Sequence, residues 1–202
     1  MNPVAGWDGG LLRGEATRIP ADPVVKCGGS LLTMADWPAR LRACHAALAA
    51  AGTPLIVVGG GAIVDGLRRV DAAGALDGAV VHDLAIALMG ITGRLVAGEL
   101  GLPLTASARG GGVLDAAAFL ADERAAGPRG WEVTSDSIAA LAARVAGRPL
   151  LLLKSCPPPA VGGDALEAAA AAGWVDDWFP RAAAGLTWIG WACPSRDAVA
   201  PR

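Results

Sequence analysis

The sequence predicts an α/β protein: a three-layer αβα sandwich with a mostly parallel central sheet. Short apolar runs such as 55–58 and 150–153 alternate with longer segments of helical periodicity, which is typical of strand–helix–strand units. Each of the clearest runs ends at a lysine or at glycines, where parallel strands commonly carry binding residues. The 202 residues, 53% of them hydrophobic, suffice for a single core. We therefore expect one domain over residues 23–202, preceded by a flexible leader over residues 1–22.

Composition narrows the classes of function. The formal charge of −2 gives no overall basic character for nucleic acid, and no lysine-rich run is present to hold an anionic membrane. The four cysteines form no C-x-x-C pair, so neither a zinc site nor a secreted disulfide framework is indicated. Residues 1–22 lack the basic start and apolar centre of a secretory signal. We expect a cytoplasmic protein that acts on a small molecule.

The first predicted strand ends in a candidate phosphate site. Val24 and Val25 are followed by Lys26, Cys27 and the run Gly28-Gly29-Ser30. Glycines let backbone N–H groups approach an anion closely, a lysine meets it as a point charge, and the serine can cap the next element.

A second strand, Leu55 to Val58, runs into Gly59, Gly60 and Gly61. The segment Asp36 to Ala51 between the two strands has helical spacing, with Asp36 as a possible N-cap. Consecutive glycines at the start of a helix present N–H groups to an anion. Arg68 follows at a distance from which it could reach that anion; the alternative is that Arg68 is an exposed helix residue. Neither glycine cluster fits the Walker or the dinucleotide spacing.

The remaining elements follow in order. Residues 80–100 form the longest apolar stretch, but His82, Asp83 and Arg94 within it favour a core helix over a membrane span. The segment 109–112 is glycine-rich and is expected to be a loop. Further elements expected are a strand at 103–107, helices at 115–120, 138–145 and 164–172, and a last strand at 186–191.

The run Pro149 to Leu153 is a continuous apolar strand that ends at Lys154. Lys26 and Lys154 are the only lysines among 17 basic residues, which suggests that both positions need an ammonium group. The alternative is that two lysines simply persisted in an arginine-rich chain. In a doubly wound sheet, ligands bind outside the carboxyl ends of the strands. We therefore expect Lys26, Gly59 to Gly61 and Lys154 to converge on one crevice.

These strand ends, together with the run Thr134-Ser135-Asp136-Ser137, resemble the amino acid kinase superfamily, which includes acetylglutamate, uridylate and isopentenyl phosphate kinases. Within it, the runs that start at His82, Trp131 and Val175 look most like those of the kinases that phosphorylate aminomethylfuranylmethyl phosphate during methanofuran synthesis. The resemblance covers residues 24 to 196.

The resemblance implies an ATP-dependent transfer of a phosphoryl group to a phosphorylated or carboxylated small molecule, with Mg²⁺ held mainly through the nucleotide phosphates. It implies catalytic roles for Lys26, Asp136 and Lys154. The implied nucleotide-binding residues are Gly28, Gly29, Ser30, Lys154, Ser155 and Arg181. The implied acceptor-binding residues are Gly59, Gly60, Gly61, Arg68, His82, Trp131 and Ser135. Relatives pair through helices, so a homodimer or higher homo-oligomer is expected.

Two departures from the family pattern keep a second interpretation open. Ser155-Cys156-Pro157-Pro158-Pro159 stands where relatives have an Asp-Gly turn, and Gly190-Trp191 stands where the furan kinases tend to have Asn-Gly. The alternative function is therefore a non-catalytic anion- or nucleotide-binding protein of the same fold.

Overall fold

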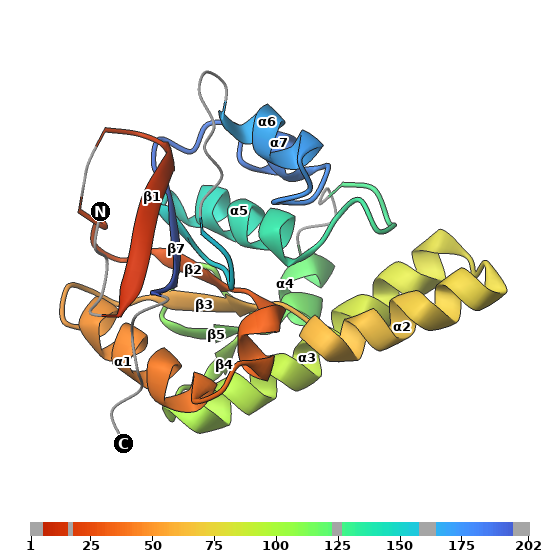
Figure 1. The fold of residues 1–202 in the computed structure, drawn as a ribbon, viewed down its shortest axis with the longest axis horizontal. Helices are drawn as coiled ribbons and strands as arrows, with labels where there is room; N and C mark the ends of the chain where they lie inside the picture. Colours follow the sequence, from red (N-terminus) through yellow and green to blue (C-terminus); the bar gives the residue numbers. More distant parts are fainter. Residues whose placement is uncertain (1–5, 16–17, 123–126, 158–164, 196–202) are drawn as a thin grey trace.

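Seven strands form one mixed sheet in this computed structural model, which describes residues 6–15, 18–122, 127–157 and 165–195 (Figure 1). The strand order is β1-β7-β6-β2-β3-β5-β4, and every neighbouring pair is parallel except β1 with β7. The expected α/β protein with a mostly parallel sheet is confirmed. The strands are β1 Trp7–Arg13, β2 Val24–Cys27, β3 Leu55–Val58, β4 Leu104–Thr105, β5 Gly112–Leu114, β6 Leu150–Leu153 and β7 Ile189–Pro194.

Helices flank this sheet and mostly follow the predicted segments. The long helix expected at 80–100 is α3, which extends from Gly78 to Leu100. A short 3₁₀ helix, η1, follows the first lysine-bearing strand. The helical elements are η1 Gly29–Thr33, α1 Trp37–Ala49, α2 Gly61–Gly74, α3 Gly78–Leu100, α4 Ala116–Asp122, α5 Ser135–Ala146, α6 Ala165–Ala171 and α7 Phe179–Ala182.

Alternate residues of the central strands point to opposite faces of the sheet and enter two separate apolar clusters. Val24 and Leu152 belong to the cluster that includes residues of α5, α6 and α7. Val25 and Leu153 belong to the cluster that includes residues of η1 and α1. This alternation places Lys26, two residues after Val24, on the α5 face of the sheet.

Two local expectations are wrong, and one strand was not expected. Residues 7–13 belong to the sheet rather than to a flexible leader, because Trp7 is buried and β1 pairs with β7 along its length. The glycine-rich segment at 109–112 is a loop as expected up to residue 111, but Gly112 begins β5, a three-residue strand that was not expected. Asp36 makes no capping hydrogen bond and adopts a left-handed backbone conformation with φ of 58°.

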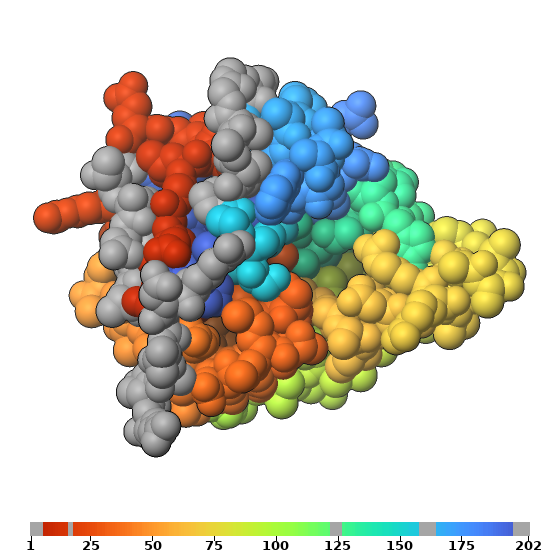
Figure 2. Space-filling view, viewed as in Figure 1, coloured from red at the N-terminus to blue at the C-terminus, as the bar shows by residue number. Residues whose placement is uncertain are grey.

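Helices α2 and α3 form a hairpin that projects beyond the sheet (Figures 1 and 2). All residues of α2 are half-buried or exposed. By length and composition alone, α3 could cross a membrane. In the fold one face of it packs beside the sheet through Ile86, Met89, Val96 and Ala97, and the opposite face is exposed, so the expected core helix is buried on one side only.

Candidate functional site

The carboxyl ends of β6, β2 and β3 lie side by side, as the strand order requires. In the parallel register, Cys27 faces Leu153 on one side and Val58 on the other. The Gly28 N–H donates to Leu153 O over 2.8 Å, and the Gly59 N–H donates to Cys27 O over 2.9 Å. Both lysine-bearing strands and the glycine turn therefore reach one edge of the sheet together.

The two glycine turns touch each other through their backbones. A Cβ atom on Gly29 would overlap the backbone of Gly61, and a Cβ on Gly61 would overlap the backbone of Gly29. Gly61 also has φ of +52°, a conformation that glycine adopts without strain. Glycine is needed at both positions for the turns to approach this closely.

We expect Gly29→Ala to destabilise the fold by about 1–3 kcal/mol, because the added methyl group must push two backbone segments apart. Gly66→Ala is the matched control. Gly66 lies in α2, the helix that begins at Gly61, and a Cβ atom on Gly66 would have no neighbouring atom within 4 Å. That change should be neutral or stabilising by up to about 1 kcal/mol. Urea denaturation of both variants measures the difference; equal stabilities would contradict the close contact.

Asp136, in the first turn of α5, joins the two lysines. The Lys26 ammonium lies 2.9 Å from Asp136 Oδ1, and the Lys154 ammonium donates to Asp136 Oδ2 over 2.7 Å. These three side chains, the charge triad, are almost entirely buried, and Lys154 is the most accessible at 12%. Lys26 and Lys154 therefore meet on Asp136, but neither lysine lines the cavity beside Gly59 to Gly61, so the expected convergence on one crevice is present only in part.

The charge triad carries one net positive charge when both lysines are protonated. Burial disfavours the ionised form of Asp136, but the charges of Lys26 and Lys154 outweigh it and lower the pKa of that carboxyl. Burial, together with the charge of Lys26, lowers the pKa of Lys154 to about 8, although Asp136 acts in the opposite direction. At neutral pH the triad is a preorganised centre of positive charge, which attracts anions.

Cys27 lies next to Lys26 but is a poor candidate for a nucleophile. Burial raises the pKa of its thiol to about 12 in spite of the neighbouring ammonium, so it stays protonated. Among the residues that the structure describes, no group of three histidine, cysteine, aspartate or glutamate side chains is arranged to hold a metal ion.

A cavity of about 220 Å³ opens beside the glycine turns. Its lining contains every residue predicted to bind the acceptor: Gly59, Gly60, Gly61, Arg68, His82, Trp131 and Ser135. The Arg68 guanidinium stacks over the Trp131 ring at 4.0 Å, and Trp131 Nε1 donates to Asp71 Oδ2 over 2.7 Å. The His82 ring contacts Gly130 O at 3.2 Å. An arginine held by stacking keeps its donors free to meet an anion.

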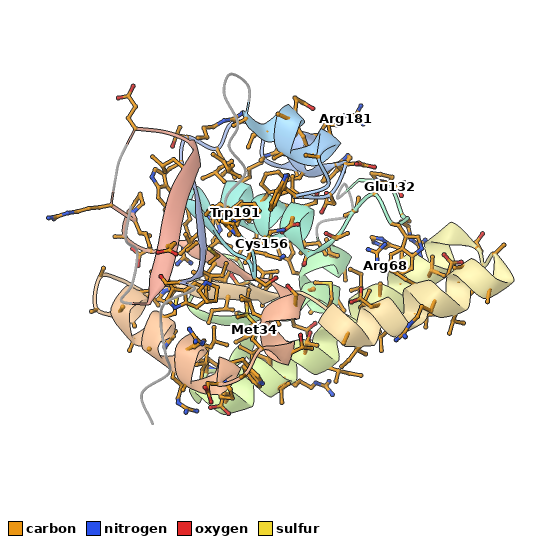
Figure 3. All side chains as sticks on the ribbon, in the orientation of Figure 1. Met34, Arg68, Glu132, Cys156, Arg181 and Trp191 are labelled. Atoms are coloured by element: carbon orange, nitrogen blue, oxygen red, sulfur yellow. The ribbon has the colours of Figure 1, made fainter. Side chains whose placement is uncertain are left out.

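The predicted nucleotide-binding residues are brought together only in part. The hydroxyls of Ser30 and Ser155 lie 2.8 Å apart. Ser30 lies inside η1, whose N-cap position is Gly28, so it does not cap that element as expected. Lys154 Nζ lies 5.3 Å from the centre of the Trp191 ring. Arg181 is exposed on α7 at the edge of the molecule, and its described contacts do not include the charge triad (Figure 3).

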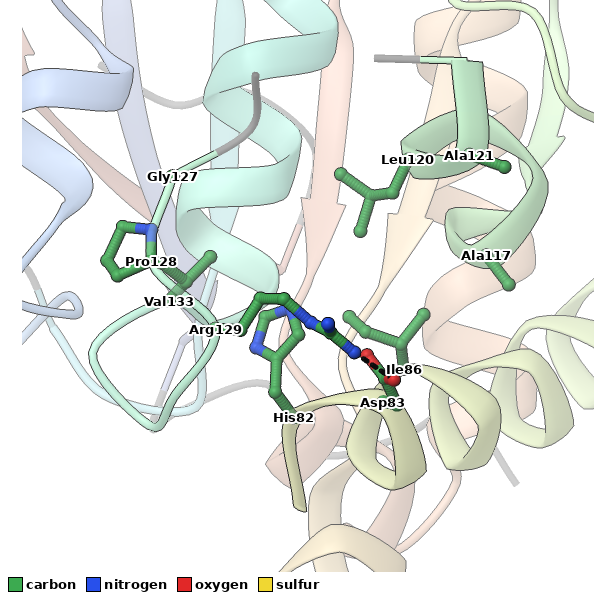
Figure 4. Close-up of a pocket in the computed structure, with 10 residues that line it drawn as sticks. All are labelled: His82, Asp83, Ile86, Ala117, Leu120, Ala121, Gly127, Pro128, Arg129 and Val133. Carbon is green, nitrogen blue, oxygen red and sulfur yellow. Dashed lines mark hydrogen bonds and ion pairs between the residues drawn. The ribbon is translucent and has the colours of Figure 1, made fainter. Parts of the chain in front are cut away.

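A second cavity of about 350 Å³ adjoins the first (Figure 4). The two share His82, Ile86 and Val133 in their linings. Most of the second lining is apolar, and an ion pair between Arg129 and Asp83 lies at its exposed rim. Together the cavities fit a small molecule with an anionic end and a less polar body.

Sequence reasoning missed several groups that shape the site. The Trp174 carbonyl accepts a hydrogen bond from Lys154 over 2.9 Å, and Asp176 binds the start of α5. A backbone carbonyl is present in every residue, so the sequence does not indicate which one binds Lys154. The only signal for Asp176 is its place in the Val175-Asp-Asp-Trp run.

Comparison of the chain with protein-family models finds no match, and a search of curated proteins finds none either.

Proposed function

We propose that this protein is an ATP-dependent small-molecule kinase. One observation supports this function most strongly: Lys26 of β2 and Lys154, which directly follows the neighbouring parallel strand β6, meet on Asp136, near two glycine turns in backbone contact. Phosphoryl transfer depends on positioning and on stabilising negative charge, and needs little covalent help from the protein. The assignment to the amino acid kinase fold, a three-layer αβα sandwich, and to the cytoplasm is part of this proposal.

In the proposed reaction, the bond between the γ-phosphorus of ATP and its bridging oxygen breaks, ADP leaves, and a bond forms to an acceptor oxygen. Lys26 and Lys154 offset the charge on the transferring group, and Asp136 keeps their ammonium groups oriented. The Gly28-Gly29 turn, the Ser30 and Ser155 hydroxyls and Lys154 would hold the nucleotide phosphates, which carry Mg²⁺ with them. Arg181 would need a rearrangement of α7 to take part.

The acceptor would place its anionic end against Gly59 to Gly61 and the stacked Arg68. Its body would extend past His82 into the second cavity. Aminomethylfuranylmethyl phosphate, the acceptor suggested by the sequence resemblance, has this combination of an anionic group and a compact ring.

We expect ATP–Mg²⁺ to bind at neutral pH and to bind more weakly in alkali. Lys154 is protonated below its pKa of about 8 and neutral above it, so its attraction for phosphate is lost as the pH rises. Isothermal titration at about pH 7.5 and about pH 9.5 should show a fall in affinity of about tenfold. The affinity of Lys154→Met should be low and should change little between these two conditions. Equal wild-type affinities would contradict a role for the Lys154 charge.

The competing function is an anion- or nucleotide-binding protein without turnover. It is favoured by Ser155-Cys156-Pro157, which replaces the Asp-Gly turn of relatives; Pro158 and Pro159 lie outside the described residues. The same titration separates the two functions, because absence of binding at millimolar ATP–Mg²⁺ would eliminate the kinase. Binding without phosphorylation of any anionic acceptor would favour the competing function.

We also propose that the protein forms a homodimer through α3. Among the described residues, all large apolar side chains that are exposed lie between Ile63 and Leu104. Val80, Leu84, Ile91 and Leu95 form a stripe on α3, and their exposed fractions are 45–52%. Apolar stripes of this kind commonly mark protein interfaces.

Leu84→Glu with Ile91→Glu should convert the dimer to a monomer of 20.1 kDa, because both carboxylates would be buried at the interface. Ala171→Glu, an exposed position on α6, is the matched control and should leave the dimer intact. Light scattering during size-exclusion chromatography measures the mass. A monomeric wild-type chain would contradict the dimer, and binding of that chain to phospholipid vesicles would identify a membrane surface as the partner of α3.

A further inference from the structure

The segment 174–178, between α6 and α7, contacts Lys154 and the helix turn that carries its ion-pair partner Asp136. The Trp174 carbonyl accepts a hydrogen bond from Lys154 Nζ over 2.9 Å. Two residues later, Asp176 reaches the first turn of α5, which carries Asp136. The Trp178 N–H donates to Glu132 O over 3.1 Å and fixes the far end of the segment.

Asp176 accepts four hydrogen bonds from the start of α5. Its Oδ2 accepts from the Thr134 N–H at 2.9 Å, from the Thr134 hydroxyl at 2.7 Å and from the Ser137 N–H at 3.1 Å. Its Oδ1 accepts from the Ser137 hydroxyl. Thr134 is the N-cap residue of α5 but makes no side-chain cap of its own. A carboxylate that is distant in sequence therefore supplies the cap.

The hydrogen bonds of Asp176 stabilise the start of α5 and also fix its orientation. Asp136 lies between Thr134 and Ser137, the two residues that Asp176 binds on both backbone and side chain. Fixing both neighbours fixes the rotation of the first turn, and with it the direction of the Asp136 carboxylate. That carboxylate must reach Lys26 and Lys154 at 2.9 and 2.7 Å simultaneously, so a small rotation would break at least one contact.

We propose that Asp176 is a positioning residue, which holds the first turn of α5 so that Asp136 bridges Lys26 and Lys154. The Trp174 carbonyl, in the same segment, holds Lys154 on its other side. The segment 174–178 thereby sets the geometry of the charge triad without touching the ligand. The positioning role of Asp176 does not depend on the proposed function; only the identity of the ligand that the charge triad binds rests on it.

The presence of only two lysines makes a direct test practical. Lysine labelled with ¹³C at Cε should give two NMR signals, one for each lysine of the triad, and a pH titration reads the midpoint of each. In Asp176→Asn, the amide N–H₂ would face the donors of Thr134 or Ser137, and the turn should rotate. The charge and the hydrogen bond of Asp136 raise the pKa of Lys154. Loss of that contact should therefore lower the Lys154 midpoint by about one unit or more.

Asp177→Asn is the matched control, since Asp177 is the adjacent carboxylate and is exposed. Its Lys154 midpoint should equal that of the wild type, and Asp176→Glu, which keeps the charge, should restore the midpoint at least in part. A lower melting temperature of Asp176→Asn with unchanged lysine midpoints would overturn the proposal and leave Asp176 as a helix cap only.

If Asp176→Asn does not fold, Thr134→Val removes one hydroxyl donor to Asp176 with little change of shape. It should move the Lys154 midpoint in the same direction by a smaller amount, and an unchanged midpoint would overturn the proposal. These measurements need no nucleotide. Failure to bind ATP would therefore reject the kinase function, whereas unmoved midpoints would reject the role of Asp176.

Discussion

Lys26→Met is expected to lower the rate of phosphoryl transfer by about 10²- to 10³-fold. The substitution removes one of the two ammonium groups on Asp136, and the net charge of the triad falls from one positive charge to zero. A preorganised donor in a buried site contributes most in the transition state, where charge on the phosphoryl group must be offset. The rate constant kcat should therefore fall more than the affinity for ATP.

The melting temperature of Lys26→Met should change little. The methionine side chain is similar in length to that of lysine, and the substitution removes a buried charge that is costly to desolvate. Lys26→Arg should also be poorly active, since a planar guanidinium does not replace a compact ammonium beside Gly28. Arg69→Met, at an exposed position on α2, is the matched control and should keep the wild-type rate. Steady-state kinetics with ATP and an anionic acceptor measure these rates. A wild-type rate for Lys26→Met would contradict the proposed mechanism.

Asp136→Asn is expected to reduce the free energy of unfolding by about 3–5 kcal/mol at neutral pH. Asp136 is the counter-ion for two buried ammonium groups, and the amide leaves both of them without a negative partner. Lys26 and Lys154 would then repel each other across a largely water-free space. Urea denaturation of the folded protein measures the loss.

A second substitution identifies the cause of that loss. In the double variant Asp136→Asn with Lys154→Met, one of the two stranded charges is gone, so part of the stability should return. If instead Asp136→Asn loses less than about 1 kcal/mol, the lysines are not held by the carboxylate, and the charge triad has been wrongly described.

The sequence was informative where chemistry coincides with strand ends. Lys26 and Lys154 could be placed together because each follows a short apolar run, and parallel strands bring their carboxyl ends to one edge. The glycines at 28–29 and 59–61 identified the turns for the same reason. The other residues that line the first cavity, Arg68, His82, Trp131 and Ser135, were expected there only from the family resemblance.

The sequence was uninformative where a role depends on contacts between distant segments. Trp7–Arg13 forms a strand because β7 pairs with it and Trp7 is buried, and neither fact appears in its local pattern. Asp176 lies 42 residues from Thr134, which it binds. The resemblance implied a nucleotide contact for Arg181, yet in the structure it is exposed on α7. Alignment of a motif does not fix the direction of a side chain.

The most direct test of the central claim is to titrate ATP–Mg²⁺ into protein that carries ¹³C at Cε of its two lysines. If Lys26 and Lys154 bind the transferring phosphate, both signals should shift, and both should saturate at the same nucleotide concentration. Mg²⁺ alone should leave them in place. Saturable ATP binding without a shift of either lysine signal would contradict the account, because the nucleotide would then bind away from the charge triad.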